Sequence, residues 1–262
     1  MSGSVKGKTI IVTGAGGGLG SAIASDLATN GARVAVADIN RDAAAAVVHE
    51  ITKAGGDAIA VAVDVGNRDQ VRAVISEVVA KYGRLDVMFN NAGVSQTCPF
   101  MEVTEADFNR IIRINSLGVL LGTQEAARQM LAQGGGGKII NTASIAGKQG
   151  WADYAHYCAS KFAVVALTQS AARSFARHKI TVNCFSPGVV ETELWKQLDE
   201  DALKYGVTEK PKQLIDGFTQ NILLGRVSTA NDVIGTTNFL ASDASDYITG
   251  QTIMVDGGMV LI

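Results

Sequence analysis

The chain has 262 residues, of which 47% are hydrophobic and 18% are charged. This composition excludes an intrinsically disordered chain, and a formal net charge of -2 provides no basic footprint for nucleic acid or an anionic membrane. No apolar run approaches the ~20 residues that span a bilayer, and the first residues lack the apolar core of a signal segment. A cytoplasmic protein is therefore expected. Three widely spaced cysteines indicate buried or idle thiols rather than a disulfide framework.

Short apolar runs alternate with longer amphipathic stretches along the chain. The predicted strands are Lys8–Thr13, Ala32–Asp38, Ala58–Asp64, Leu85–Asn90, Lys138–Thr142, Thr181–Cys184 and Thr252–Val255. The predicted helices are Leu19–Asn30, Arg41–Ala54, Arg68–Tyr82, Glu105–Ala132 and Asp153–Arg177. Strands that are apolar at nearly every position are typical of parallel sheets buried on both faces. The pattern predicts one α/β domain over residues 1–262, a doubly wound parallel sheet without an interdomain linker.

A glycine-rich turn, Thr13–Gly20, joins the first strand to the first helix. Glycine lets the backbone approach a pyrophosphate, and the N-terminus of the helix offers unpaired N–H groups. Asp38 ends the second strand, where a carboxylate can bind ribose hydroxyls and repel a 2′-phosphate. NAD is therefore favoured over NADP, with Arg41 as the one residue against this interpretation. The alternatives are a tight turn at the glycines and a solvated strand end at Asp38.

A second group of residues indicates acid–base chemistry. Tyr157 and Lys161 share one face of a predicted helix, and a cation one turn away should lower the pKa of the phenol. Ser144 follows the strand Lys138–Thr142 and offers a hydroxyl to a reacting oxygen. No metal site is expected, because the three histidines, His49, His156 and His178, have no ligand-like spacing.

Together these motifs resemble the short-chain dehydrogenase/reductase family over essentially the whole chain. The matching residues are Thr13–Gly20 (T-G-x-x-x-G-x-G), Asn90–Gly93 (N-N-A-G), Asn115, Ser144, Tyr157–Lys161 (Y-x-x-x-K), Pro187–Thr192 and Asp256–Gly258. The resemblance implies a Rossmann-type sheet of about seven strands with helices on both faces, and a homotetramer. An apolar tail, Met259, Val260 and Ile262, has no evident use within the chain and suggests a subunit contact.

The resemblance also implies a role for each matching residue. Tyr157 would be the general acid/base, Lys161 would lower its pKa and bind the nicotinamide ribose, Ser144 would orient the substrate oxygen, and Asn115 would hold a water in a proton relay. The implied cofactor-binding residues are Gly14, Gly18, Leu19, Gly20, Asp38, Asp64, Val65, Asn91, Ala92, Gly93, Tyr157, Lys161, Pro187, Gly188, Val190 and Thr192. The expected substrate-binding residues are Ser144, Ile145, Gln149, Trp151, Tyr157, Gly188 and Trp195.

These features predict an NAD(H)-dependent oxidoreductase that interconverts a secondary alcohol and its ketone. Resemblance to bacterial acetoin/2,3-butanediol and polyol dehydrogenases suggests a polyol, vicinal diol or related small alcohol. Ile145, which directly follows Ser144, favours a less polar or bulkier alcohol. A variable lid is expected over residues 189–226. Two alternatives remain: an enoyl reductase that uses Tyr154, seven residues before Lys161, and a protein that binds or senses the dinucleotide without turnover.

Overall fold

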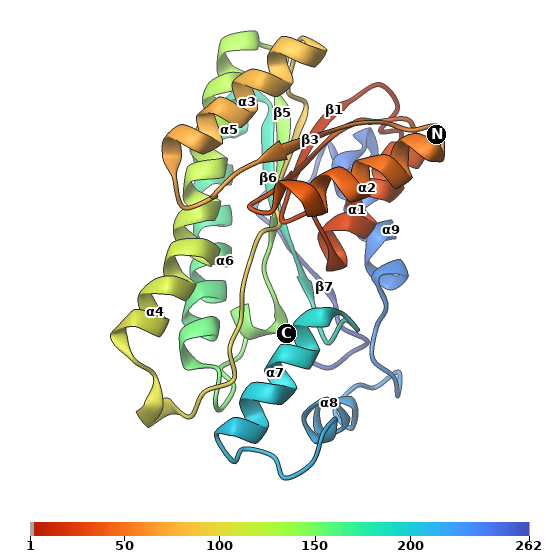
Figure 1. Ribbon diagram of the computed structural model, residues 1–262. Coiled ribbons are helices and arrows are strands. Elements are labelled where there is room, and N and C mark those ends of the chain that lie inside the picture. The colour runs from red at the N-terminus through yellow and green to blue at the C-terminus, as the bar shows by residue number, and fades with distance from the viewer. Residues whose placement is uncertain (1–2, 262) are drawn as a thin grey trace.

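A single twisted sheet of parallel strands forms the centre of the computed structural model, which describes residues 3–261 (Figure 1). The strands are β1 (Thr9–Thr13), β2 (Arg33–Asp38), β3 (Asp57–Ala62), β4 (Val87–Asn90), β5 (Gly137–Thr142), β6 (Ile180–Pro187) and β7 (Thr252–Val255). Their order in the seven-stranded sheet is β3-β2-β1-β4-β5-β6-β7. The predicted Rossmann-type α/β fold is confirmed.

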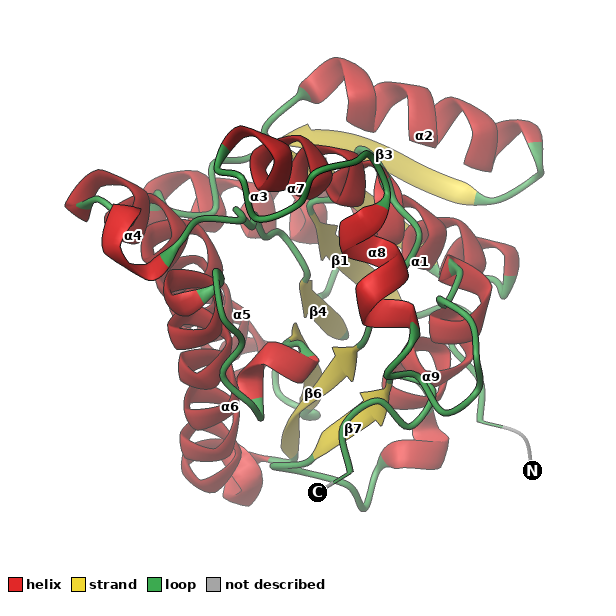
Figure 2. Ribbon diagram, turned by 90° about the horizontal axis from the view of Figure 1, so that it is seen from below, coloured by secondary structure: helices red, strands yellow, loops and turns green. Residues whose placement is uncertain are grey.

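Helices cover both faces of the sheet, with α1, α2 and α9 on one face and α3, α5 and α6 on the other (Figures 1 and 2). The helices are α1 (Gly18–Thr29), α2 (Arg41–Lys53), α3 (Arg68–Tyr82), α4 (Glu105–Ile112), α5 (Gly118–Gln133), α6 (Ala155–Phe175), α7 (Glu193–Lys204), α8 (Gln213–Thr219) and α9 (Ala230–Ala241). Alternate residues of β1 face opposite layers: Ile10 and Val12 pack with α1, and Ile11 packs with α3 and α5. The fully apolar strand pattern therefore has the predicted cause, burial on both sides.

The order of the strands creates a crevice at one edge of the sheet. Because β1 has β2 on one side and β4 on the other, the connections that leave these strands diverge at their carboxyl ends. Helices α7 and α8 lie beyond this edge (Figures 1 and 2). They lie within the lid expected over residues 189–226, so about half of this lid is helical.

One predicted helix differs from the structure in an informative way. The stretch expected as a single helix over Glu105–Ala132 is divided into α4 and α5 by a π-helical turn, Arg113–Leu117. The hydrophobic period cannot reveal this turn because it adds one residue without ending the helix. Helix α9 was not predicted, and β6 extends three residues beyond the predicted Cys184 to Pro187.

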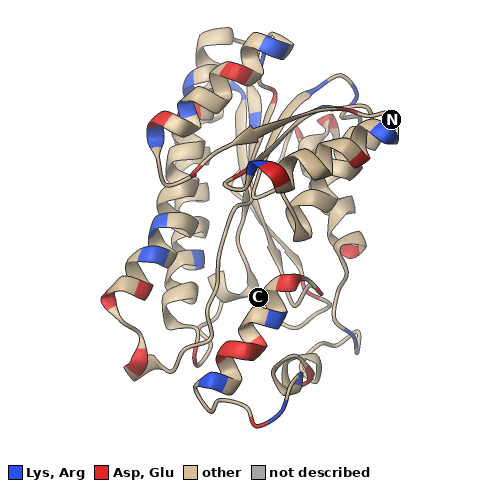
Figure 3. Ribbon diagram, in the orientation of Figure 1, with Lys and Arg blue, Asp and Glu red and all other residues tan. Residues whose placement is uncertain are grey.

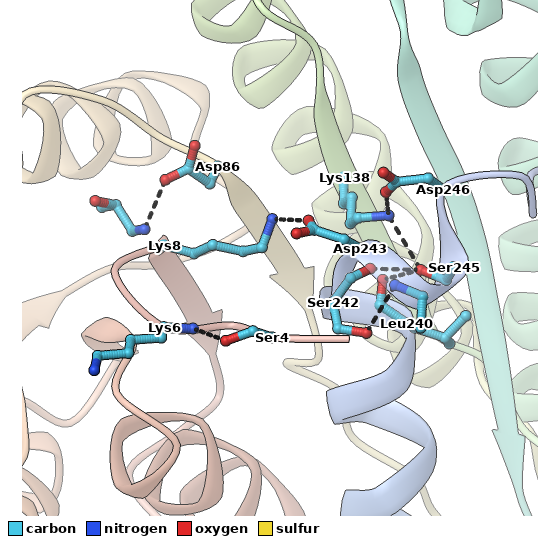
Figure 4. Close-up of polar contacts among 12 residues, drawn as sticks. Ser4, Lys6, Lys8, Asp86, Lys138, Leu240, Ser242, Asp243, Ser245 and Asp246 are labelled. Atoms are coloured by element: carbon cyan, nitrogen blue, oxygen red, sulfur yellow. Dashed lines mark hydrogen bonds and ion pairs between the residues drawn. The ribbon is translucent and has the colours of Figure 1, made fainter. Parts of the chain in front are cut away.

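Ion pairs tie the C-terminal part of the chain to the amino ends of the strands (Figure 4). Lys8, before β1, pairs with Asp243 at 2.6 Å. Lys138, near the start of β5, is buried; its Nζ lies 2.7 Å from Asp246 and donates to Ser245 Oγ at 3.1 Å. These contacts lie at the opposite end of the strands from the crevice.

Charged residues of both signs are interspersed along the helices, and the strands carry few of them (Figure 3). Within residues 3–261, no helix combines the length and the apolar character needed to cross a membrane.

Candidate active site

A cavity of about 610 Å³ opens at the carboxyl edge of the sheet. All sixteen residues predicted to bind the cofactor line it: Gly14, Gly18, Leu19, Gly20, Asp38, Asp64, Val65, Asn91, Ala92, Gly93, Tyr157, Lys161, Pro187, Gly188, Val190 and Thr192. Six of the seven predicted substrate residues also line it: Ser144, Ile145, Trp151, Tyr157, Gly188 and Trp195. The cavity therefore joins the two predicted halves of the site.

The glycine turn brings the N-terminus of α1 to the cavity wall. Gly14 has a φ of 63°, and a Cβ there would lie 2.7 Å from the Cα of Ala92, so this position requires glycine. A Cβ on Gly17 would meet open space. In the described chain, α1 has no side-chain cap and no acidic residue in its first turn, whereas Asn40 and Asn67 cap α2 and α3. Unpaired N–H groups and the helix dipole thus suit a phosphate at α1.

Asp38 lies at the end of β2 and faces the cavity. Its carboxylate accepts hydrogen bonds from the backbone N–H groups of Gly16 and Asn40, both at 2.9 Å. These bonds fix a negative charge near the glycine turn. Arg41, the basic residue nearest in sequence, is exposed and is not among the cavity-lining residues.

The end of the cavity where the adenosine is expected contains an ion pair. Arg113, in the π turn, lies 2.5 Å from a carboxylate oxygen of Asp64, which follows β3. Hydrogen bonding to Arg113 lowers the pKa of Asp64, and Gly66 N–H donates to the same carboxylate. Asp64 is therefore ionised at neutral pH and its position is restrained.

Ser144, Tyr157 and Lys161 meet at the other end of the cavity. Ser144 begins the short 3₁₀ turn η3 (Ile145–Gly147), and its Oγ accepts from Ala146 N–H. Tyr157 and Lys161 lie one turn apart on α6. Lys161 Nζ donates to the carbonyl of Thr142 at 2.8 Å and lies 5.6 Å from the centre of the Tyr157 ring. The structure thus brings together three of the four predicted catalytic side chains.

Burial has the largest effect on the pKa values of Tyr157 and Lys161. Burial raises the pKa of Tyr157 to about 12, while the neighbouring Ser144 hydroxyl acts in the opposite direction. Burial also lowers the pKa of Lys161 to about 8. Desolvation has the largest effect on both groups and the ammonium bonds to Thr142, so the lowering of the Tyr157 pKa by Lys161 stays a prediction.

Asn115 is fully buried in the π turn and is not among the residues that line the cavity. Its side chain accepts from Val94 N–H at 2.9 Å and donates to Val94 O at 2.8 Å and to Ser160 Oγ at 3.0 Å. The amide therefore clamps the segment that follows β4 against α6. Asn115, a candidate functional residue, thus lies in a π turn within a helix, and π turns are frequent at functional sites.

Tyr154, the alternative tyrosine, occupies a different environment. Its hydroxyl lies 2.8 Å from Thr97 Oγ1, which itself donates to the backbone carbonyl of Leu198. Burial raises the pKa of Tyr154 to about 12. Its ring lines the cavity, but its hydroxyl is engaged with Thr97.

The structure departs from the predicted substrate wall in two ways. Gln149 does not line the cavity, contrary to prediction, because it is exposed on the loop after η3. Phe218 of α8 does line it, although it lies far along the chain from every motif. Leu194, Leu198 and Ser95 were missed as well. Of these missed residues, only Leu194 and Leu198 could have been found from the sequence, because they lie close to Trp195 in the predicted lid.

The chain is similar to known proteins in both sequence and structure. Residues 14–260 match the family model described as Enoyl-(Acyl carrier protein) reductase. The chain is 40% identical over 253 residues to diacetyl reductase [(S)-acetoin forming] of Staphylococcus epidermidis, covering 97% of this chain and 98% of the relative.

The chain belongs to the short-chain dehydrogenase/reductase family.

Two further members of this family are informative. The L-2,3-butanediol dehydrogenase of Corynebacterium glutamicum is 41% identical over 256 residues, covering 97% of this chain and 98% of that protein. The crystal structure of NAD⁺-bound xylitol dehydrogenase superposes with a TM-score of 0.92 at 34% identity, covering 97% of this chain and 99% of that one. These relatives are oxidoreductases, and their names support the same class of activity here.

Proposed function

We propose that the protein is an NAD(H)-dependent oxidoreductase that interconverts a secondary alcohol, of the polyol, vicinal diol or related small-alcohol type, and its ketone. One observation carries this proposal: a single cavity connects the uncapped N-terminus of α1 with Ser144, Tyr157 and Lys161. A dinucleotide that lies along this cavity would place its reactive ring beside the three side chains.

The side chains have distinct roles in this proposal. A bound NAD would supply the hydride acceptor. In the reduction, Tyr157 would donate its phenol proton to the ketone oxygen, and its high pKa keeps that proton in place at neutral pH. In the oxidation, the phenol would first lose its own proton to water, and the resulting phenolate would take the proton of the substrate hydroxyl. Ser144 donates a hydrogen bond to the same substrate oxygen. Lys161 holds the Thr142 carbonyl and the ribose, and Asn115 is a positioning residue.

Asp38 supports NAD rather than NADP as the cofactor. Its carboxylate is held by Gly16 and Asn40 at the place where an adenosine ribose would lie. A 2′-phosphate would meet this negative charge, and the exposed Arg41 does not line the cavity to compensate for it.

The contacts of Tyr154 argue against an enoyl reductase that uses this residue. Its hydroxyl is engaged with Thr97, whereas Tyr157 lies beside Ser144. The non-catalytic alternative is disfavoured because Asn115, Ser144, Tyr157 and Lys161 are all present.

The test measures, by absorbance, the formation of NADH from NAD and of NADPH from NADP. The substrates are secondary alcohols, diols and polyols, each assayed with the two cofactors side by side. Turnover with NAD on one group of alcohols is the expected result. Turnover restricted to NADP would contradict the role of Asp38. Absence of turnover with every alcohol and ketone, despite NADH binding, would favour the non-catalytic alternative.

A further inference from the structure

The substrate end of the cavity has an aromatic wall built around Phe218. The ring of Phe218 lies 5.4 Å from Trp151, 5.4 Å from Trp195 and 6.0 Å from Tyr154, measured between ring centres. All four rings line the cavity. They come from three separate segments: the loop before α6, helix α7 and helix α8. The lid therefore closes the site with an aromatic surface.

This wall is continuous with an apolar cluster that reaches the candidate acid/base. Tyr157 packs against the buried cluster that contains Leu198 and Leu214 of the lid, and Ile145 adds a further aliphatic side chain to the cavity. An apolar surface thus begins at the reacting position and extends into the lid.

Few polar groups are available at this end of the cavity. Of the charged residues that line the described cavity, Asp38, Asp64 and Arg113 belong to the adenosine end, Lys161 donates to Thr142, and Glu193 is exposed and pairs with Lys196. There is therefore no cation placed to bind a carboxylate or phosphate of the substrate within the described chain.

Two buried polar atoms in residues of this wall lack a hydrogen-bond partner in the described chain. Trp151 Nε1 and Ser95 Oγ have no hydrogen-bond partner among residues 3–261. The indole N–H can only donate, so it requires an acceptor such as a hydroxyl or carbonyl oxygen. A buried donor without a partner is unfavourable, so a substrate oxygen that came within hydrogen-bond distance of Trp151 Nε1 would be bound favourably.

We infer that the substrate is an uncharged secondary alcohol, or its ketone, with a ring-bearing apolar arm on one side of the reacting carbon and one further oxygen for Trp151 Nε1–H. This inference rests on the proposed function and narrows it. An aryl vicinal diol has the required chemistry, whereas a linear polyol would place several hydroxyl groups against aromatic rings. Each hydroxyl left without a partner weakens binding by roughly tenfold.

The first experiment compares kcat/KM with NAD for three alcohols: 1-phenyl-1,2-propanediol, 2,3-butanediol and xylitol. We expect the aryl diol to exceed 2,3-butanediol by about tenfold and xylitol by about a hundredfold. Equal or greater activity with xylitol would overturn the inference and leave the proposed function standing. No turnover with any of the three would count against the proposed function, and binding then decides the inference separately.

Binding is measured by the fluorescence of Trp151 and Trp195, the only two tryptophans in the 262-residue sequence. Benzamide, which is not reduced, is titrated in the presence of NADH against acetamide and xylitol. Saturable quenching by benzamide at concentrations about tenfold lower than by acetamide supports the aromatic wall, whether or not turnover occurs. Absence of a difference between benzamide and acetamide overturns the inference.

Variants separate the two elements of the inference. Phe218→Leu should raise KM for the aryl diol by about tenfold while KM for 2,3-butanediol changes little. Phe100→Leu is the matched control, because Phe100 is 74% exposed and is not among the cavity-lining residues.

Trp151→Phe keeps a ring and removes the donor, so it should reduce the advantage of the aryl diol over 1-phenylethanol, which lacks the second oxygen. Parallel changes for all substrates would overturn this assignment.

Discussion

At the scale of single residues, burial controls the two titratable groups of the candidate site. Tyr157 and Lys161 lie one turn apart on α6, yet their pKa values shift in the directions opposite to those of an ion pair. The pKa of the phenol rises to about 12, and the pKa of the ammonium falls to about 8. Both shifts favour the neutral form, as expected for groups removed from water. Tyr157 is therefore protonated at neutral pH, and in the proposed reduction this proton would go to the ketone oxygen.

The role of Tyr157 is tested by removing its hydroxyl alone. Tyr157→Phe should lower kcat by about a thousandfold, because general acid catalysis supplies two to four powers of ten, while NADH binding persists. Tyr154→Phe is the matched control and should lower kcat only slightly, since the Tyr154 hydroxyl is engaged with Thr97. Comparable losses in both variants, measured as initial rates, would contradict the assignment.

The buried ammonium of Lys161 makes stability depend on pH. Between the folded pKa of about 8 and the usual value of 10.5, the unfolded chain binds more protons than the folded one, so this group makes stability rise with pH. Relative to Lys161→Met, the wild type should gain on the order of 3 kcal/mol from about pH 7 to about pH 10.5. Chemical unfolding of both proteins at the two pH values measures this difference; an unchanged gap would contradict it.

At the scale of elements, the π turn between α4 and α5 positions the segment that follows β4. The turn directs Asn115 at the backbone of Val94, whose neighbour Gly93 lies in the cavity wall close to Lys161. A Cβ on Gly93 would come within 3.3 Å of Asn115 Oδ1 and 3.5 Å of Lys161 Nζ. An irregular helix is thus part of the support of the site.

Removal of this clamp should cost stability. Asn115→Ala leaves the partly buried N–H and C=O of Val94 without their side-chain partner, and we expect a loss of about 2 kcal/mol in the free energy of unfolding. Chemical unfolding checks this against Asn109→Ala, which changes an exposed asparagine of α4. If the two variants unfold alike, Asn115 does not act as a clamp.

At the scale of the whole molecule, the two ends of the sheet have different tasks. The carboxyl ends of the strands open into the cavity, whereas the amino ends carry the contacts of Lys8 and Lys138 with the C-terminal part of the chain. We therefore expect that stability and activity can be altered separately.

Lys138→Met tests this separation. The variant loses the contacts with Asp246 and Ser245, so its free energy of unfolding should fall by about 1 kcal/mol while kcat/KM stays unchanged. Lys81→Met, at an exposed position of α3, is the matched control and should change neither quantity. A selective fall in kcat/KM for Lys138→Met would show that the two ends are coupled.

The position of Val260 in the structure changes the prediction that the C-terminal tail makes a subunit contact. Val260 was expected to have no use within the chain, but it is buried and its N–H donates to Asp256 at 2.8 Å; Ile262 lies outside the described residues. Deletion of the tail would therefore disturb the subunit itself. The more exposed apolar residues Leu223 and Leu224, each 72% exposed, provide a cleaner test.

We predict a homotetramer that Leu223→Ser and Leu224→Ser, combined in one chain, convert toward smaller species. The physical reason is that apolar side chains exposed side by side on one loop favour burial against another subunit. Sedimentation velocity measures the outcome, and thermal unfolding of the variant shows whether its fold is retained. A monomeric wild type, or an unchanged sedimentation profile in a folded variant, would contradict the prediction.

The sequence by itself determined the parallel sheet, the glycine turn and the identity of the residues around Ser144 and Tyr157, because these depend on local periodicity and on motifs of fixed spacing. Tertiary structure decided what depends on contacts between distant segments. It placed Phe218 against Trp151, left Gln149 in solvent, turned the Asn115 side chain toward Val94 and removed enough water from Tyr157 to raise its pKa. Packing and desolvation arise only when segments far apart in the chain meet, so no local pattern encodes them.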